Sequence, residues 1–241
     1  MNPNFKQEVY EDYGFGVSSI RSRFPGGKSG RFEMRADSTV TVGNKGRSEI
    51  KINDTDLLFT KRKFAYSIYM GSSDFPNDLD VSDYYCYCMQ EHGWDTRTPP
   101  RGIFIKGPKM YYKINYGATL GKTDPDGSEL FDLGAPPKDR WVDFYWDVNI
   151  SYNSDGWVNG FMSKPDPVTG VIKLYQIIKY SGPTGYNNSI MADYPKFGKY
   201  KRRWGPNVDK LIIYYDEICW GKGTANIRDI IPDKDMAIVY L

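Results

Sequence analysis

Short runs of alternating apolar and polar residues, separated by turn residues, constrain the fold of this chain most strongly. The clearest run covers 141–151, where Val142, Phe144 and Trp146 occupy alternate positions. A period of two predicts a β-strand with one buried face. Roughly a dozen such runs follow one another, and none shows sustained helical periodicity. The pattern predicts an all-β fold, an antiparallel β-sandwich of the jelly-roll (concanavalin-like) type with an open concave groove.

The expected strands are spread along the whole chain. They cover 31–37, 47–51, 63–70, 84–92, 102–106, 110–116, 141–151, 157–162, 171–179, 194–203 and 209–220. We expect 123–129 to be a turn, and a first weak strand before the turn at Pro25. With 241 residues and no linker, repeat or change in composition, the chain is predicted to be one domain over 1–241.

Charge and cysteine content exclude several classes of function. Lys and Arg number 32 and Asp and Glu 30, so no overall field favours nucleic acid or a membrane surface. No apolar run of about 18 residues predicts a transmembrane helix. The start, Met1–Lys6, lacks an apolar signal region, so the protein is cytosolic or a signal has been removed. Cys86, Cys88 and Cys219 lack a metal-binding spacing, and free buried thiols are expected.

His92 is the only histidine, and it ends the aromatic strand expected at 84–92. Its ordinary pKa suits proton transfer near neutral pH. Alternation places Gln90 and His92 on one strand face, and Cys86 and Cys88 on that same face. Taken alone, this pattern favours a strand-end histidine without a special role.

Two further expected strands present an unusual polar face. The first carries Arg47, Glu49 and Lys51, and the second carries Tyr194, Lys196, Gly198, Tyr200 and Arg202. Gly198 leaves space where another backbone or a ligand can approach. These are the groups that β-elimination on a uronic-acid polymer needs. Cationic and amide donors neutralise the carboxylate, a base removes the neighbouring carbon-bound proton, and an acid protonates the leaving oxygen.

The motifs Arg-Ser-Glu-Ile-Lys, Gln-Glu-His and Tyr-Pro-Lys-Phe-Gly-Lys-Tyr resemble the three strand motifs of jelly-roll polysaccharide lyases. In the alginate lyases these read Arg-x-Glu-Leu-Arg, Gln-x-His and Tyr-Phe-Lys-x-Gly-x-Tyr. The wider pattern is more similar to the heparin lyase I and glucuronan lyase group. It includes 31–35, Pro99-Pro100, 139–144 and 214–218, so the resemblance spans roughly 30–221 in order.

This resemblance implies a secreted, monomeric lyase acting on glucuronan, alginate or a heparin-like polymer without a redox cofactor. It implies that Arg47 and Gln90 neutralise the substrate carboxylate, and that His92 is the base or assists in neutralisation. Tyr200 would be the acid and, for syn elimination, also the base. The implied substrate-binding residues are Lys196, Lys51, Arg202 and Tyr145. Members of the family often carry a structural calcium away from the groove, and Asp216 is its candidate ligand here.

Two departures from the family motifs affect substrate preference. Lys51 replaces the second arginine, so a bidentate fork becomes a point charge. Pro195 replaces the usual aromatic residue and removes a ladder donor, which indicates an edge or a bulge.

Other functions remain open from the sequence. A non-catalytic carbohydrate-binding module would use Trp94 and Tyr145 as stacking platforms. The basic run at Lys199, Lys201, Arg202 and Arg203 would suit nucleic acid, but the balanced net charge favours an anionic polysaccharide or a solvated face. A laminarinase-type glycosidase would need a Glu-x-Asp-x-Glu set on one strand, which the sequence lacks. The segment 124–127 resembles a calcium loop without the full ligand spacing, so an ordinary turn is expected.

Overall fold

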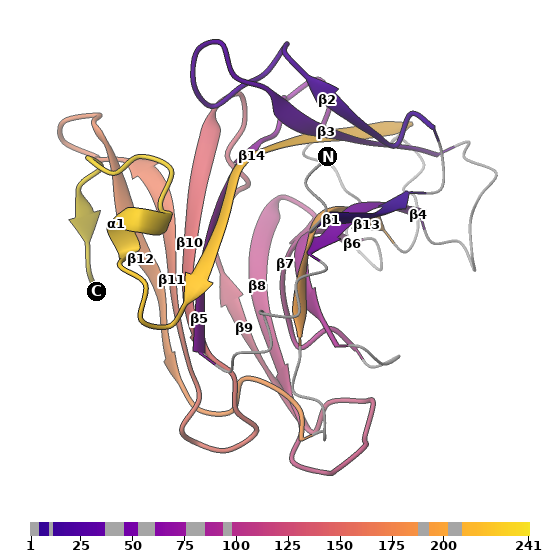
Figure 1. The fold of residues 1–241 in the computed structure, drawn as a ribbon, viewed down its shortest axis with the longest axis vertical. Helices are drawn as coiled ribbons and strands as arrows, with labels where there is room; N and C mark the ends of the chain where they lie inside the picture. Colours follow the sequence, from indigo (N-terminus) through magenta and orange to yellow (C-terminus); the bar gives the residue numbers. More distant parts are fainter. Residues whose placement is uncertain are drawn as a thin grey trace.

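The structure, a computed structural model, describes residues 5–9, 12–36, 46–52, 61–75, 85–93, 98–187, 193–201 and 209–241. Within these ranges the chain forms two β-sheets packed face to face, with one short helix, α1 (Ile227–Ile230), on the outside of one sheet (Figure 1). None of the described helices is long and apolar enough to span a membrane.

Over the described residues, one sheet has seven strands and the other has eight. The order in the first is β1 (Phe5–Val9), β4 (Gly46–Ile52), β13 (Tyr194–Lys201), β6 (Tyr85–His92), β7 (Arg101–Lys106), β8 (Lys109–Tyr116) and β9 (Gly127–Asp132). The order in the second is β15 (Ile238–Val239), β12 (Ile172–Ser181), β11 (Trp157–Pro165), β10 (Trp141–Asn149), β5 (Lys61–Tyr69), β14 (Lys210–Lys222), β3 (Ser29–Arg35) and β2 (Phe15–Ser18). All paired strands are antiparallel except β12 and β15.

The core lies between the two sheets and comes from alternate residues of the strands. Phe144 and Trp146 of β10 face inward, and Tyr112 of β8 packs on Trp146 with ring centroids 4.3 Å apart. Burying each such side chain stabilises the fold by roughly 1.5–3 kcal/mol. The stacked pair joins the two sheets, and the predicted antiparallel jelly-roll sandwich is confirmed.

The sequence prediction was wrong at one edge of the seven-stranded sheet. A turn was expected at 123–129, but strand β9 begins within that range, at Gly127, and pairs with β8. An edge strand buries little of either face, and Leu130 of β9 is exposed, so the apolar signal is weak there. The assignment of 1–241 to one domain stays a prediction.

A β-bulge in β6 corrects the predicted position of two cysteines. The pairing of β6 with β7 shifts register between Tyr87 and Met89. The extra residue, Cys88, turns inward together with Cys86, and both are buried in the core without a disulfide bond. One additional residue reverses the alternation that follows, so Gln90 and His92 face away from the cysteines.

Candidate active site

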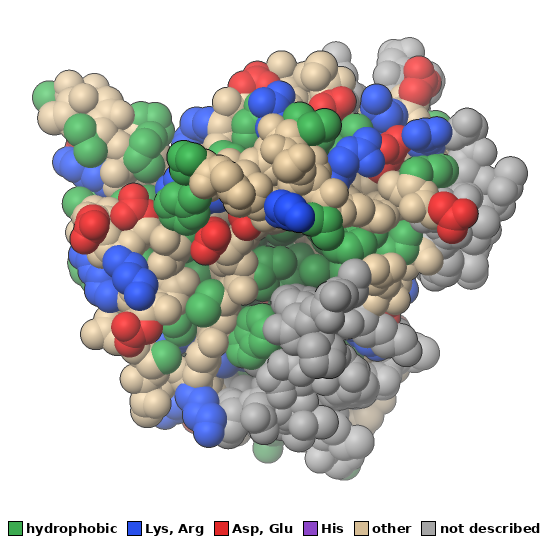
Figure 2. Space-filling view, turned by 45° about the horizontal axis from the view of Figure 1, so that its top comes forward, with side chains coloured by type: hydrophobic (Ala, Val, Ile, Leu, Met, Phe, Trp, Pro, Cys, Tyr) green, Lys and Arg blue, Asp and Glu red, His purple; other side chains and the backbone are tan. Residues whose placement is uncertain are grey.

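Six of the predicted site residues lie together on the outer face of the seven-stranded sheet, the face that points away from the core. They come from three adjacent strands, in the order β4, β13, β6. Strand pairing sets Tyr200 opposite Arg47, and sets Lys196 between Lys51 and Gln90. His92 lies opposite Tyr194. Elsewhere, charges of both signs are interspersed over the surface seen in Figure 2, consistent with the balanced composition.

Gly198 of β13 allows side chains of β4 and β6 to contact each other across β13. Gln90 Nε2 on β6 donates a hydrogen bond of 2.7 Å to Glu49 Oε1 on β4, although β13 runs between these strands. Opposite Glu49, β13 carries Gly198, which has no side chain to separate the two groups. Its φ of 127° favours glycine, and an added Cβ would collide with the backbone of Ser48. The space predicted beside Gly198 is therefore filled by the backbone of β4.

Arg47 is held between two carboxylates and one tyrosine ring. Its Nε lies 3.1 Å from Glu49 Oε2, and its Nη1 lies 3.2 Å from Glu8 Oε2. The guanidinium carbon also lies 5.2 Å from the centroid of the Tyr200 ring. This cation–π contact fixes the ring of Tyr200 beside a permanent positive charge.

Glu8 on the edge strand β1 belongs to this site, and the sequence analysis missed it. Its carboxylate accepts from Lys196 Nζ at 2.6 Å and lies 3.4 Å from Lys51 Nζ, in addition to its contact with Arg47. Burial alone would raise the pKa of Glu8, but the hydrogen bond and charge of Lys196, with the other two cations, lower it. All three cations that would meet a substrate carboxylate already contact this carboxylate of the chain.

The imidazole of His92 is half-buried, and its geometry suits a proton acceptor. Nδ1 lies 2.7 Å from the carbonyl oxygen of Gly93, so Nδ1 carries the proton and Nε2 retains its lone pair. Burial lowers the pKa of His92, and the charges of Lys196 and Arg47 lower it further, against the opposing bond to Gly93. The neutral form, which is the basic form, is favoured near neutral pH.

Tyr194 is a second tyrosine of the site, to which the sequence analysis gave no role. Its ring lies 5.1 Å from Lys51 Nζ and 5.5 Å from Lys196 Nζ, and it packs beside the His92 ring. Burial, with the nearby charge of Glu8, raises the pKa of Tyr194 to about 12. Its phenol therefore stays protonated at neutral pH.

A buried ion network supports the site strands from the core side. Glu91, between Gln90 and His92, points inward, where its Oε1 accepts from Arg101 Nε at 2.8 Å and its Oε2 pairs with Arg62 of the other sheet. Arg101 Nη2 also lies 3.0 Å from Asp193 Oδ2, directly before β13. Burial and the adjacent Arg101 lower the pKa of Arg62 to about 9, which leaves it charged at neutral pH. The network links β6, β7, β5 and the start of β13.

Aromatic rings continue the site across the sheet. Tyr200 lies 6.4 Å from Tyr87 on β6, which lies 5.6 Å from Phe104 on β7, measured between ring centroids. Phe104 in turn stacks on Tyr111 of β8 at 5.4 Å. This row runs perpendicular to the strands and offers successive apolar ring faces, on which sugar C–H surfaces pack well.

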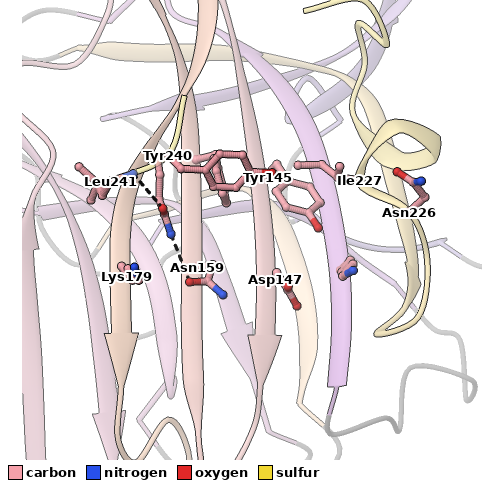
Figure 3. Close-up of a pocket in the computed structure, with 11 residues that line it drawn as sticks. Tyr145, Asp147, Asn159, Lys179, Asn226, Ile227, Tyr240 and Leu241 are labelled. Atoms are coloured by element: carbon pink, nitrogen blue, oxygen red, sulfur yellow. Dashed lines mark hydrogen bonds between the residues drawn. The ribbon is translucent and has the colours of Figure 1, made fainter. Parts of the chain in front are cut away.

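Tyr145, predicted to bind substrate, lies elsewhere. It is on β10 of the eight-stranded sheet, on the face that points away from the core, and it is buried beside Phe161 (Figure 3). The sequence indicated its strand and its face, but not that this strand belongs to the other sheet. Tyr145 is therefore not part of the candidate active site, and its burial does not suit a stacking platform.

The residues around Asp216 do not fit a calcium site. Its Oδ2 accepts from the backbone N–H of Arg23 at 2.8 Å, and its Oδ1 accepts from the N–H of Glu217 at 2.9 Å. The Arg23 guanidinium, bound to Asp143, adds a positive charge there. Among the described residues, no three metal-ligating side chains form a group that could hold a metal ion.

The predicted basic face also changes in the structure. Lys199 lies on the same face of β13 as Phe197, which points into the core, and it is fully buried. Burial lowers the pKa of Lys199 to about 7. It therefore contributes no solvated charge to a polyanion-binding surface. Arg202, Arg203 and Trp94 lie outside the described residues, as does the side chain of Lys201.

The fold and the face just described define a jelly-roll protein with a cationic, tyrosine-containing face on its seven-stranded sheet. Comparison with protein-family models gives a match to the polysaccharide lyase family over residues 15–219. A comparison with curated protein sequences gave no match. This chain belongs to the polysaccharide lyase family and is a polysaccharide lyase.

Solved structures with a similar fold include both lyases and a glucanase. An endo-β-1,4-glucuronan lyase from the fungus Trichoderma reesei superposes with a TM-score of 0.65 at 12% identity, covering 95% of this chain and 94% of that one. A PL-14 alginate lyase from Aplysia kurodai has a TM-score of 0.55 at 11% identity, covering 92% and 91%. A β-glucanase catalytic domain from Podospora anserina reaches 0.54 at 12%, covering 83% and 74%. At these identities the likeness supports the fold, and the chemistry has to be argued from the site.

Proposed function

We propose that this lyase cleaves a uronic-acid polymer by β-elimination on the outer face of its seven-stranded sheet. The observation that carries the proposal is that one sheet face presents Arg47 and Gln90 together with the neutral imidazole of His92 and the phenol of Tyr200. A cationic donor, an amide, a base and an acid are the four groups that this reaction requires.

Each residue has a defined part in the proposed step. Arg47 and Gln90 bind the substrate carboxylate and stabilise the charge that builds up on it. Nε2 of His92 removes the proton from the carbon beside that carboxylate. The electron pair of the broken C–H bond forms the C=C bond, and the C–O bond to the 4-linked sugar breaks. The hydroxyl of Tyr200 donates its proton to the leaving oxygen, so no water, metal or redox cofactor is consumed.

The charge balance of the site favours a polymer with one negative charge per sugar. Arg47, Lys51 and Lys196 supply three positive charges, and Glu8 and Glu49 supply two carboxylates. With both carboxylates ionised, one net positive charge faces the substrate. Non-sulfated glucuronan and alginate carry one carboxylate on each sugar, whereas a heparin-like chain adds sulfates. We therefore propose a non-sulfated uronate polymer as the substrate.

A comparison of polymers tests this preference. Equal masses of glucuronan, alginate and heparin are incubated with the enzyme, and chain shortening is followed by viscosity. We expect shortening of glucuronan or alginate and little change in heparin. Faster shortening of heparin than of both other polymers would contradict the preference.

Replacing Glu8 with Gln is expected to tighten substrate binding. The substitution removes the carboxylate that contacts all three cations. The net charge of the site therefore rises from +1 to +2. We expect KM for the preferred polymer to fall roughly tenfold, about 1.4 kcal/mol of binding free energy. Steady-state kinetics measures the effect, with Glu129→Gln on the opposite edge strand β9 as the charge-matched control. A fall in kcat at constant KM would instead make Glu8 a positioning residue.

The pH dependence of the reaction is expected to follow His92. Because burial and the adjacent cations lower its pKa, the imidazole remains neutral below the ordinary histidine value of about 6.5. The acidic limb of kcat/KM is therefore expected below pH ~6.5. Lys196→Gln removes one of the charges responsible, so this limb should move toward higher pH. An acidic limb above the ordinary value in the unmodified enzyme would rule out neutral His92 as the base.

We also propose how the polymer meets the protein. The row Tyr200, Tyr87, Phe104 and Tyr111 supports binding of consecutive sugars across β13, β6, β7 and β8. A polymer of this kind lies outside the cell, so we propose that the enzyme acts there, as a monomer, because the described site draws all its groups from one chain.

A further inference from the structure

A cavity lies on the opposite side of the molecule from the candidate active site. It has a volume of about 520 Å³ and lies on the outer face of the eight-stranded sheet, where β10, β11 and β12 are overlaid by the segment around α1 and by the C-terminal residues (Figure 3). The mechanism proposed above uses none of its residues. Its lining combines aromatic rings with amide and charged side chains, the composition of a site for a hydroxyl-rich ligand.

The aromatic wall of this cavity offers one exposed ring on a firm support. Tyr240 is 65% exposed, and its ring packs edge to face against Phe161 at 5.6 Å and 88°. Phe161 is buried and packs in turn against Tyr145 at 5.5 Å. A ring braced in this way loses little conformational freedom when a sugar face stacks on it.

The polar floor is fixed by hydrogen bonds. Gln176 Nε2 donates to Asn159 Oδ1 at 3.2 Å, and Gln176 Oε1 accepts from the N–H of Leu241 at 3.1 Å. The first bond uses the carbonyl oxygen of Asn159, so its amide nitrogen can donate to a ligand hydroxyl. Asp147 lies on the adjacent strand beside Asn159, as Figure 3 shows, and supplies an acceptor.

The charges of the lining favour an acidic sugar. Lys63 Nζ donates to the carbonyl oxygen of Ala225 at 2.8 Å and lies opposite Asp147 in the strand pairing. Lys179, exposed on β12, is a second cation of the lining. Counted over side chains, two lysines stand against one aspartate in this lining, which favours a ligand that carries a carboxylate.

From this arrangement we infer that the cavity is a second binding site for an oligosaccharide segment of a uronate polymer, with Tyr240 as the stacking platform and Asn159 and Lys179 as polar contacts. The identity of the polymer rests on the proposed function. A long chain held at this site raises the effective concentration of its other segments at the active face, without taking part in the reaction.

Binding is tested in a Tyr200→Phe background, so that the probe is not cleaved. Calorimetric titration with a uronate hexasaccharide is expected to show two sites per chain, and one site after Tyr240→Ala with Asn159→Ala. Retention of this double variant in gels containing the polymer should fall at least fivefold. Tyr175→Ala, on the same sheet outside the cavity, is the matched control and should leave both values unchanged. In the active enzyme, the double variant should keep its kcat on short oligosaccharides.

The outcomes separate this site from the proposed reaction. Unchanged stoichiometry and retention in the double variant would overturn the inference, even if the wild type cleaves the polymer. A neutral cello-oligosaccharide of equal length is titrated in parallel. If only the neutral probe binds in a Tyr240-dependent way, the inferred acidic ligand is wrong. Loss of the second uronate site in the double variant supports the inference, whether or not the wild type shows elimination.

Discussion

Replacing Tyr200 with Phe is expected to lower kcat by about 10²–10⁴-fold, the contribution that a positioned general acid typically makes. The phenol lies opposite Arg47, whose guanidinium holds the ring at 5.2 Å, and removal of one oxygen leaves these contacts in place. The change should therefore appear in kcat, with KM and the free energy of unfolding nearly unaltered. Steady-state rates on a uronate polymer, with circular dichroism of the folded protein, measure both.

The matched control for this substitution is Tyr175→Phe. Tyr175 lies on β12 of the other sheet, where its hydroxyl donates to Asp166 at 3.0 Å, and it is expected to retain the full rate. Tyr194 provides the sharper comparison because its protonated phenol belongs to the same face. A near-normal rate for Tyr200→Phe, with collapse of the rate for Tyr194→Phe, would transfer the acid role to Tyr194.

Replacing Glu91 with Gln is expected to destabilise the fold by about 3–5 kcal/mol, because it leaves two buried guanidinium groups without their shared carboxylate. Glu91 is fully buried, and it pairs with Arg101 of its own sheet and Arg62 of the other. Urea unfolding measures the free-energy difference. The amide retains the shape of the side chain, so the loss reports charge pairing and not a cavity.

Asp132→Asn is the control for the Glu91 substitution. It also exchanges a carboxylate for an amide, but its partner Lys109 is half-exposed at the surface, so a change below about 1 kcal/mol is expected. Equal effects of the two substitutions would show that the buried network does not hold the two sheets together. Because Glu91 lies between Gln90 and His92, a destabilised variant should also lose activity at temperatures where it remains mostly folded.

Strand alternation predicted much of the site, because neighbouring strands of one face collect their polar residues. Arg47, Lys51 and Gln90, with His92, Lys196 and Tyr200, needed only the correct strand positions to meet. Alternation fails where a bulge adds one residue. The bulge at Cys88 reversed the predicted face of Cys86 and Cys88.

Other parts of the site depend on pairings that local patterns do not encode. Glu8 enters it only because β1 pairs with β4, which begins far along the chain. Strand alternation places Tyr145 on an outward face, as expected of a groove residue. Its strand, β10, nevertheless belongs to the eight-stranded sheet and not to the sheet of the candidate active site. The ion network around Glu91 forms only because strand pairing brings Arg101 of β7, and sheet packing brings Arg62 of β5, to this carboxylate. A search for charged residues at apolar strand positions would have indicated Glu91 and Arg101.

The most direct test of the proposed chemistry measures ultraviolet absorbance and chain length in the same sample of a non-sulfated uronate polymer. Each elimination places a C=C bond conjugated with the carboxylate at the new non-reducing end. The account predicts that absorbance rises in proportion to the number of new ends, and that the Tyr200→Phe variant loses both signals together. Chain shortening without any rise in absorbance, by the folded wild-type enzyme, would contradict it.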